Sequence, residues 1–228
     1  MSTKLTEHLL SISTLPPYAA ATRHSFLTQA RNSTLPDRKL SLWLSQDRIY
    51  AAHAYPRFIG ALISHIPFTD SDAVHGDDER RKQRILEVLV GCLDNIVREV
   101  RFFQDTAAEF GLQIEGWPER KGTRDYTAEM ARISLSGSLE DGLVFLWAME
   151  QVYFDAWNYV KQGQPASTAI DRFASNWSSP EFAVFVSSLA DLVNDLGIIP
   201  GSQGWSKAED IWRRVIELEV GFWPDDNE

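Results

Sequence analysis

The longest helical pattern in this chain runs from Asp78 to about Leu112. Within it, apolar side chains recur every three or four residues and therefore share one face of an α-helix. A helix about 50 Å long can bury such a face only against other long helices. The segment therefore predicts a helical bundle. The members of the face are Ile85, Leu89, Cys92, Leu93, Ile96, Val100 and Phe103.

The rest of the sequence repeats this periodicity between proline, glycine and polar turn signals. Ser138, with Asp141 three residues later, is typical of a capped helix start. Pro56 lacks a backbone N–H and predicts a kink within a helix. We therefore expect an all-α fold in one domain over residues 1–228, with any ligand site between facing helices. The expected helices cover residues 18–31, 36–66, 78–112, 123–136, 139–162, 167–175, 180–196 and 206–223.

The charge of the chain limits its partners. Its 22 Lys and Arg against 32 Asp and Glu residues give a net charge of −10, which repels nucleic acid and anionic membranes. No run of about 18 apolar residues could span a bilayer, and no secretory signal is visible. The single cysteine, Cys92, excludes an intramolecular disulfide. These features predict a cytoplasmic protein that binds neither nucleic acid nor membranes.

One helical stripe combines aromatic residues with a carboxylate. At 3.6 residues per turn, Trp43, Asp47, Tyr50 and Ala54 fall on the same side of a helix. A carboxylate is expensive to bury unless something binds it. An aromatic wall, a carboxylate and a phenol suit a flat, polar, nitrogen-rich ligand. The competing interpretation is a surface Asp at the rim of an ordinary amphipathic helix.

Two further helices repeat this combination. Glu150 shares a stripe with Phe154 and lies beside Tyr153, and Glu219 precedes Phe222 by three residues. A carboxyl group among aromatic rings is desolvated, which raises its pKa toward the range useful for acid–base catalysis. Each of these residues alone could turn toward water. Together with Asp47 they favour a pocket shared by at least two of the three carboxyl groups.

Other reactive residues fit structural roles better. Cys92 lies on an apolar helix face and is expected in the core. The five histidines show no metal-ligand spacing, so no metal site is predicted. His24 could be a lone haem ligand, but a capping or core histidine is the more common arrangement. Glu99, between Arg98 and Arg101, faces either water or the core.

The order of several short motifs resembles that of the TenA family, which comprises thiaminase II and its relatives. These motifs are a His-x-Phe-Leu with a Thr-Leu-Pro in residues 24–36, a Gln-Asp-x-x-Tyr in 43–50, and residues 123–126, 176–182 and 218–223. They extend over nearly the whole chain. The resemblance implies a haem-oxygenase-like helical bundle without a cofactor, assembled as a homodimer or homotetramer. It also implies a pocket for an aminopyrimidine, because family members hydrolyse thiamin or its degradation products to release hydroxymethylpyrimidine for salvage.

The chain departs from thiaminase II at two positions. Met149 stands where that branch has its nucleophilic Cys, and Ala174 stands where it has a Tyr. Residues 146–153 are instead similar to a second branch, which has a Glu, here Glu150, in place of the Cys. That branch is associated with hydrolysis of formylaminopyrimidine and aminopyrimidine. The resemblance therefore implies this activity rather than covalent cleavage of thiamin.

The expected roles combine the residue pattern with the resemblance. Asp47 would hydrogen-bond the ring nitrogen and exocyclic amine of the pyrimidine. Glu150 would take a proton from water or steady the attacked carbon, and Glu219 would protonate the departing nitrogen. The alternatives are a catalytically idle protein that binds a pyrimidine or another heteroaromatic compound and, third, haem binding through His24. The aromatic residues expected to bind the substrate are Trp43, Tyr50, Tyr126, Tyr153, Phe154 and Phe222.

Overall fold

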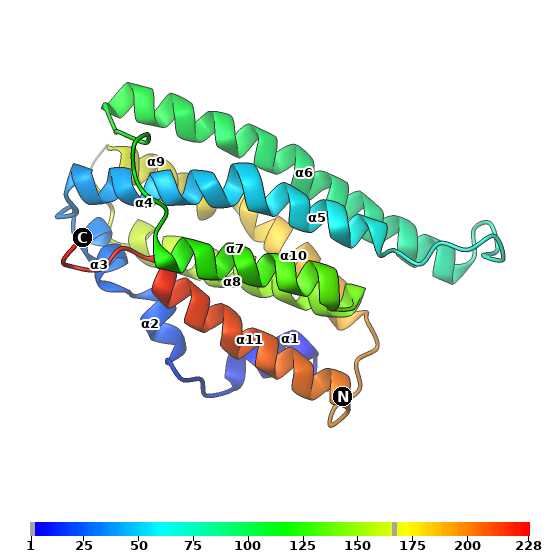
Figure 1. Ribbon diagram of the computed structural model, residues 1–228. Coiled ribbons are helices and arrows are strands. Elements are labelled where there is room, and N and C mark those ends of the chain that lie inside the picture. The colour runs from blue at the N-terminus through cyan, green and yellow to red at the C-terminus, as the bar shows by residue number, and fades with distance from the viewer. Residues whose placement is uncertain (1–2, 166–167) are drawn as a thin grey trace.

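Every element in the described part of the chain, residues 3–165 and 168–228 of the computed structural model, is helical (Figure 1). This confirms the all-α fold class predicted from the periodicity. None of these helices is both long and apolar enough to cross a membrane. The elements are α1 (Leu5–Ser11), α2 (Tyr18–Thr22), α3 (Ser25–Arg31), α4 (Asp37–Ile49), the π-helical turn η1 (Tyr50–Ala54), α5 (Tyr55–Ser64), α6 (Asp77–Phe110), α7 (Lys121–Ser136), α8 (Leu139–Lys161), α9 (Ala169–Trp177), α10 (Pro180–Asn194) and α11 (Gln203–Phe222).

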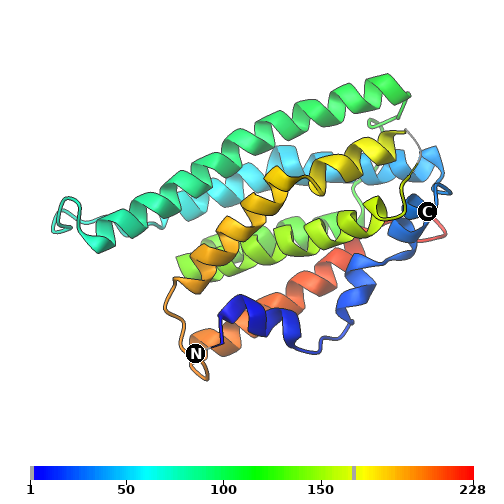
Figure 2. The ribbon, with the colours of Figure 1, turned by 180° about the vertical axis from the view of Figure 1, so that it is seen from behind.

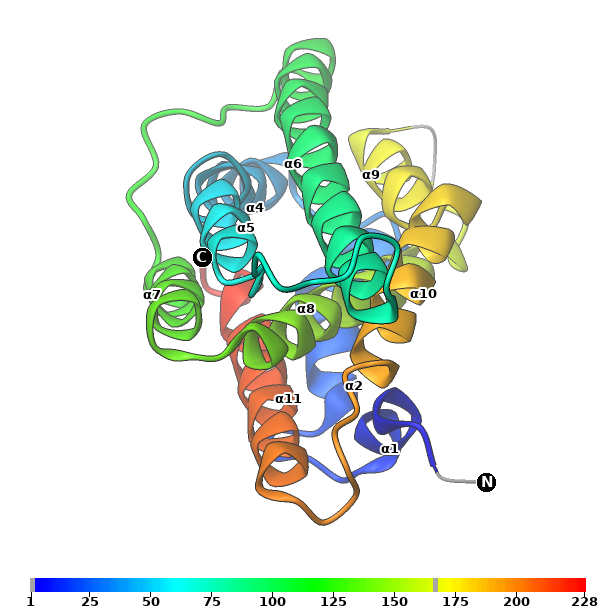
Figure 3. The same ribbon diagram turned by 90° about the vertical axis from the view of Figure 1, so that its right-hand side faces the viewer.

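Helix α8 lies at the centre of the bundle and packs against α2, α3, α9, α10 and α11 (Figures 1 and 3). Its residues 141–149 are all buried, so this part of the helix is covered on every side. The Ser138 hydroxyl accepts a hydrogen bond from the Asp141 N–H, and the Asp141 carboxylate accepts one from the Ser138 N–H. The predicted cap at the start of this helix is thereby confirmed.

Helix α6 is the long outer helix of the bundle. It packs against α5, η1 and α9, and the view from behind shows α9 and α10 alongside it (Figure 2). The apolar stripe predicted from Ile85 to Phe103 is its inner face, and every member of the stripe is buried or half-buried. Val90 and Val97, which lie on its other side, are exposed.

The N-terminal region differs from the prediction. The expected helix over residues 18–31 is two helices, α2 and α3, which are separated at Arg23 and His24. His24 Nδ1 accepts a hydrogen bond from the Phe26 N–H at 3.2 Å, so this residue caps the start of α3. Helix α1 was not predicted, because seven residues are too few to display a helical repeat.

The interruption expected near Pro56 takes the form of the π-helical turn η1. Pro56 has no N–H to donate to the Ala52 carbonyl, and the Tyr55 N–H bonds to the Tyr50 carbonyl, five residues back. Side chains five residues apart point about 140° away from each other in a regular α-helix. The wider turn brings Tyr50 and Tyr55 to the same side, with ring centroids 6.0 Å apart.

Helices α7 and α11 approach each other closely at Gly122. A Cβ atom on Gly122 would lie 1.9 Å from the Gly221 carbonyl oxygen and 2.6 Å from the carbonyl carbon. These are backbone atoms that cannot rotate away. The glycine therefore sets the spacing between the helices that hold Tyr126 and Glu219.

Gly122→Ala should force these helices apart and lower the free energy of unfolding by about 1–3 kcal/mol. Gly221→Ala on the facing helix is the matched control, because no atom lies within 4 Å of its Cβ position. Helix propensity should make that control neutral or slightly stabilising. Urea denaturation of both variants checks this, and equal stabilities would contradict it.

Candidate active site

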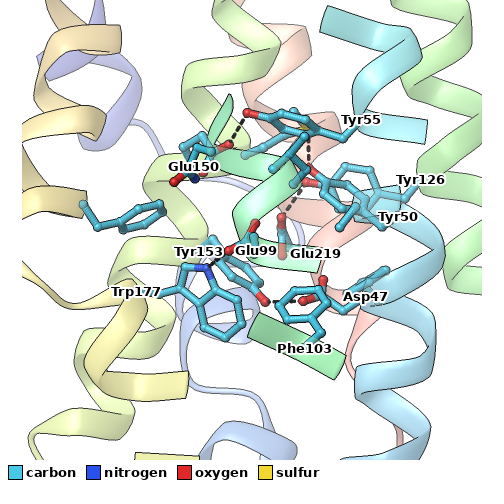
Figure 4. A pocket seen from close by; sticks show the side chains of 16 residues that line it. Asp47, Tyr50, Tyr55, Glu99, Phe103, Tyr126, Glu150, Tyr153, Trp177 and Glu219 are labelled. Atoms are coloured by element: carbon cyan, nitrogen blue, oxygen red, sulfur yellow. Dashed lines mark hydrogen bonds between the residues drawn. The ribbon is translucent and has the colours of Figure 1, made fainter. Parts of the chain in front are cut away.

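A cavity inside the bundle is lined by residues of every element from α4 to α11 (Figure 4). The lining residues are Asp47, Tyr50, Ala51, Tyr55, Asn95, Ile96, Glu99, Phe103, Tyr126, Met149, Glu150, Tyr153, Trp177, Phe182, Glu219 and Phe222.

Acidic side chains dominate the polar lining of the cavity. Asp47 comes from α4, Glu99 from α6, Glu150 from α8 and Glu219 from α11, and Figure 4 shows all of them in the same space. None of the described lining residues is a Lys, Arg or His. Water screens these groups poorly because they are buried or half-buried, so their potential favours a positively charged or proton-donating ligand.

An aromatic side chain donates a hydrogen bond to each of these carboxyl groups. The Tyr153 hydroxyl donates to Asp47 Oδ2 at 2.9 Å, and the Tyr55 hydroxyl donates to Glu150 Oε1 at 2.8 Å. Because Tyr55 is the residue that η1 turns toward the cavity, the π-helical turn supplies the hydrogen-bond partner of Glu150. Such a bond stabilises the ionised carboxylate but adds no positive charge.

The other two carboxyl groups have one such partner each. Tyr126 donates to Glu219 Oε1, and the indole N–H of Trp177 donates to Glu99 Oε1. Glu219 Oε2 is buried and has no hydrogen-bond partner among the described residues. A buried acceptor without a partner is costly, so this oxygen is suited to holding a proton or a donor group of a ligand.

Burial raises the pKa of all four groups above their ordinary values. The pKa rises to about 8 for Glu219 and, with a smaller effect of the nearby Glu99, to about 8 for Glu150. Burial raises the pKa of Glu99 to about 7 and that of Asp47 well above its usual range, where the Glu99 charge adds to the effect. The site therefore contains groups that can exchange protons near neutral pH.

Aromatic rings form the walls between these carboxyl groups. Tyr126 meets Tyr50 edge-on at 5.3 Å and Phe222 edge-on at 5.8 Å between ring centroids. Tyr153 and Trp177, the rings that donate hydrogen bonds to Asp47 and Glu99, lie edge-on with ring centroids 5.1 Å apart. The Tyr50 hydroxyl points to Met149 Sδ at 3.3 Å, a weak acceptor. These flat walls and this phenol suit an aromatic ligand.

Gln46 fixes the position of the neighbouring Asp47. Its side-chain oxygen accepts hydrogen bonds from the Arg120 N–H at 2.8 Å and the Thr123 hydroxyl at 2.7 Å, and its amide donates to the Pro118 carbonyl at 3.2 Å. Gln46 is fully buried. These bonds tie α4 to the start of α7 one residue before Asp47.

The structure brings most of the sequence-predicted residues into this cavity. The exceptions are Trp43 and Phe154. Trp43 is fully buried in an aromatic cluster behind the site, edge-on to Phe173 at 5.3 Å, so its place is the core. Phe154 packs against Phe182 at 6.1 Å and is not part of the cavity wall. The predicted residues found in the wall are Asp47, Tyr50, Tyr126, Glu150, Tyr153, Glu219 and Phe222.

Several lining residues are not predictable from the local sequence pattern. Tyr55 escaped because a regular α-helical period places it away from Tyr50. The sequence does not decide the orientation of Glu99, because the flanking arginines favour a solvated face while the apolar stripe of Ile96 and Phe103 runs beside it on the same helix. Trp177 lies in one of the family-like motifs, but nothing in that motif indicated that its indole would meet a carboxyl group.

Two residues considered as alternatives lie outside the cavity. His24 caps α3 and does not line the cavity, so the haem alternative lacks a histidine there. Cys92 is buried on the inner face of α6, and burial raises the pKa of its thiol to about 12. A thiol that stays protonated at neutral pH is a poor nucleophile.

A helical bundle with an enclosed acidic and aromatic cavity defines a class of proteins that bind small molecules between helices. Within that class, residues 13–227 match the model of the TENA/THI-4/PQQC family, and the chain belongs to this family. A TenA homologue from P. horikoshii has a TM-score of 0.79, with 18% identity and 97% of each chain covered. A TenA homologue from Pyrococcus furiosus has a TM-score of 0.78, with 22% identity, 96% of this chain and 98% of that one. The predicted haem-oxygenase-like fold is thereby confirmed.

Two relatives found by sequence match most of this chain. A Glycine max protein named "Probable bifunctional TENA-E protein" is 23% identical over 208 residues, which are 90% of this chain and 86% of that protein. A Fusarium pseudograminearum protein named "Probable transcription factor" is 24% identical over 241 residues, 89% of this chain and 47% of that protein. The chain thus spans about half the length of the Fusarium relative.

The raised pKa of Glu219 predicts a pH-dependent stability. The folded protein keeps this proton up to about pH 8, whereas the unfolded chain loses it near the ordinary value of 4.5. The stability that this group contributes is therefore lost as pH rises from about 4.5 to about 8. The glutamine in Glu219→Gln does not titrate, so the Tm of this variant should match the wild type at pH 5 and exceed it by at least about 5 °C at pH 9.

Glu217→Gln is the control for this experiment, because Glu217 is exposed two residues earlier on the same helix. Its effect on Tm should be the same at both pH values. Thermal unfolding of the three proteins at pH 5 and pH 9 provides the measurement. If the Tm difference between Glu219→Gln and the wild type does not change with pH, the pKa of Glu219 is not raised in the folded protein.

Proposed function

We propose that this protein hydrolyses C–N bonds of thiamin degradation products, converting formylaminopyrimidine and aminopyrimidine to hydroxymethylpyrimidine. The observation that carries the proposal is the aromatic cavity whose described polar lining holds acidic groups and no cation. An aminopyrimidine offers a flat ring, an amidine edge and a basic amine, and each matches a part of this lining. Membership of the TENA/THI-4/PQQC family supports a thiamin-related role.

Asp47 binds the pyrimidine ring in this proposal. Its carboxylate accepts hydrogen bonds from the exocyclic amine and from a protonated ring nitrogen, a bidentate pairing that an amidine edge favours. The Tyr153 hydroxyl at 2.9 Å holds the carboxylate in place. Tyr50, Tyr126 and Phe222 contact the ring through their faces and edges.

Glu150 and Glu219 divide the proton transfers between two helices. Ionised Glu150 takes a proton from water, whose oxygen attacks the carbon that carries the departing nitrogen. Glu219 keeps that nitrogen protonated as it departs, either by giving its proton to a neutral nitrogen or by accepting a hydrogen bond from one that is already cationic, so that aminopyrimidine yields hydroxymethylpyrimidine and ammonia. With the formyl compound, water attacks the formyl carbon, and formate and the amine are released. Similar pKa values of about 8 let either group hold the proton in the free protein.

Water is the nucleophile in this proposal because no suitable thiol faces the cavity. Met149, at the position of the thiaminase II cysteine, presents a thioether that has no ionisable proton. Cys92 lies outside the lining, and its pKa of about 12 keeps it protonated. The Glycine max relative is named "Probable bifunctional TENA-E protein", which supports a TenA-type activity.

Turnover should depend on both glutamates. The purified protein should release hydroxymethylpyrimidine from aminopyrimidine and formylaminopyrimidine but not from thiamin. Glu150→Gln and Glu219→Gln should each lower kcat by about 10²- to 10⁴-fold, because each removes one proton-transfer group while keeping its shape. Product formation measured by liquid chromatography checks this.

Glu140→Gln on α8 and Glu217→Gln on α11 are matched controls, because both residues are exposed on the same two helices. Both should retain wild-type kcat. Full turnover in the two active-site variants would refute the assigned roles. Binding of hydroxymethylpyrimidine without turnover of any substrate would indicate a catalytically idle protein that retains only ligand recognition.

A further inference from the structure

Glu99 is the cavity carboxyl group that the proposed reaction leaves without a role. It comes from α6, whereas Asp47, Glu150 and Glu219 come from α4, α8 and α11. The Trp177 indole donates a hydrogen bond to its Oε1, and its Oε2 has no hydrogen-bond partner among residues 3–165 and 168–228. One oxygen is thus held in place, and the other is left to accept a hydrogen bond from a ligand.

The position of Glu99 links the cavity to the outside. A surface groove between α6 and the α9–α10 segment shares Asn95, Glu99 and Phe182 with the cavity lining. These shared residues are half-buried, whereas Asp47 and Glu219 are 5% and 3% exposed. Glu99 therefore lies at the end of the cavity that adjoins the groove, and Asp47 lies at the deeper end.

This arrangement indicates that the side group of a bound pyrimidine, and not its ring, meets Glu99. A pyrimidine ring paired with the deeper Asp47 directs its side group either toward Glu150 and Glu219 or toward the groove. Figure 4 shows Glu99 facing the same space as these other carboxyl groups. The amine nitrogen of an aminomethyl group is a compact cation with three hydrogen-bond donors, so it can contact more than one carboxylate at once.

We propose that Glu99 selects the substrate by binding the cationic aminomethyl nitrogen, and that the α6–α10 groove is the route by which this amine enters. The proposal rests on the proposed function, since it assumes an aminopyrimidine in the cavity. A neutral side group, such as hydroxymethyl or formamide, offers Glu99 no charge, so Glu99 contributes little to its binding. Glu99 is therefore a specificity-determining residue for amine over neutral pyrimidines.

Equilibrium binding tests this without turnover. Isothermal titration calorimetry at pH 7 would compare aminopyrimidine with hydroxymethylpyrimidine, using proteins that carry Glu150→Gln to stop hydrolysis. The wild-type protein, titrated with the neutral compound alone, shows whether that background alters the cavity. Glu99→Gln should weaken binding of the amine by about tenfold to a hundredfold and change binding of the neutral compound by less than about threefold.

Glu181→Gln is the matched control. Glu181 is an exposed acidic residue that lines the same groove but not the cavity. Its substitution therefore removes one negative charge from the groove and none from the cavity. It should leave both affinities unchanged. A Tm for Glu99→Gln that is not below that of the wild type would show that the fold is retained, since the amide oxygen still accepts the Trp177 N–H.

The remaining outcomes are decisive. Equal weakening of both compounds by Glu99→Gln, or no change in either, would overturn the selection role, as would an equal effect of Glu181→Gln. Amine-selective binding that depends on Glu99, in a protein that hydrolyses neither substrate, would support this inference while the proposed reaction fails. A protein that binds neither compound, with or without Glu150→Gln, would refute both.

Discussion

Removing a carboxyl group from water raises the free energy of its ionised form, and this protein gathers Asp47, Glu99, Glu150 and Glu219 around one cavity. No cation among the described lining residues offsets their charge. Aromatic donors stabilise them instead: three phenols and one indole. The consequence is a site whose pKa values lie near neutrality and whose potential favours a basic aromatic ligand. The proposed chemistry and the proposed selectivity both depend on this constraint.

Much of the fold could be predicted because the helices are long and bury one face. The stripe from Ile85 to Phe103 and the cap at Ser138 are local patterns, and both are present as predicted. The break at His24 could not be predicted, because the apolar pattern continues across it and a capping hydrogen bond decides the geometry. The π-helical turn is similar: Pro56 signalled an irregularity, but its form depends on packing against other helices.

The candidate site was predictable where an acidic residue interrupts an aromatic stripe, as at Asp47, Glu150 and Glu219. Stripes indicate which residues leave water, but they do not distinguish a cavity wall from the core. For that reason the stripe predicts that Trp43 binds the substrate, whereas the structure places it in the core behind the site. The position of Tyr55 in the cavity wall depends on the π-helical turn, and that of Glu99 depends on the packing of α6 against α9. The pattern of a single helix therefore predicts neither residue.

The central claim is that the cavity holds protonated carboxyl groups that a cationic pyrimidine ionises. Calorimetric titration of aminopyrimidine at pH 7 into protein that carries Glu150→Gln, which stops the proposed hydrolysis, measures the protons exchanged on binding when it is repeated in buffers of different ionisation enthalpy. Because the free protein binds protons through carboxyl groups with pKa values of about 7 to 8, a bound cation should lower those pKa values and release protons to the buffer. Net proton release on binding would support the account. Binding with no proton exchange, or with net uptake, would contradict it.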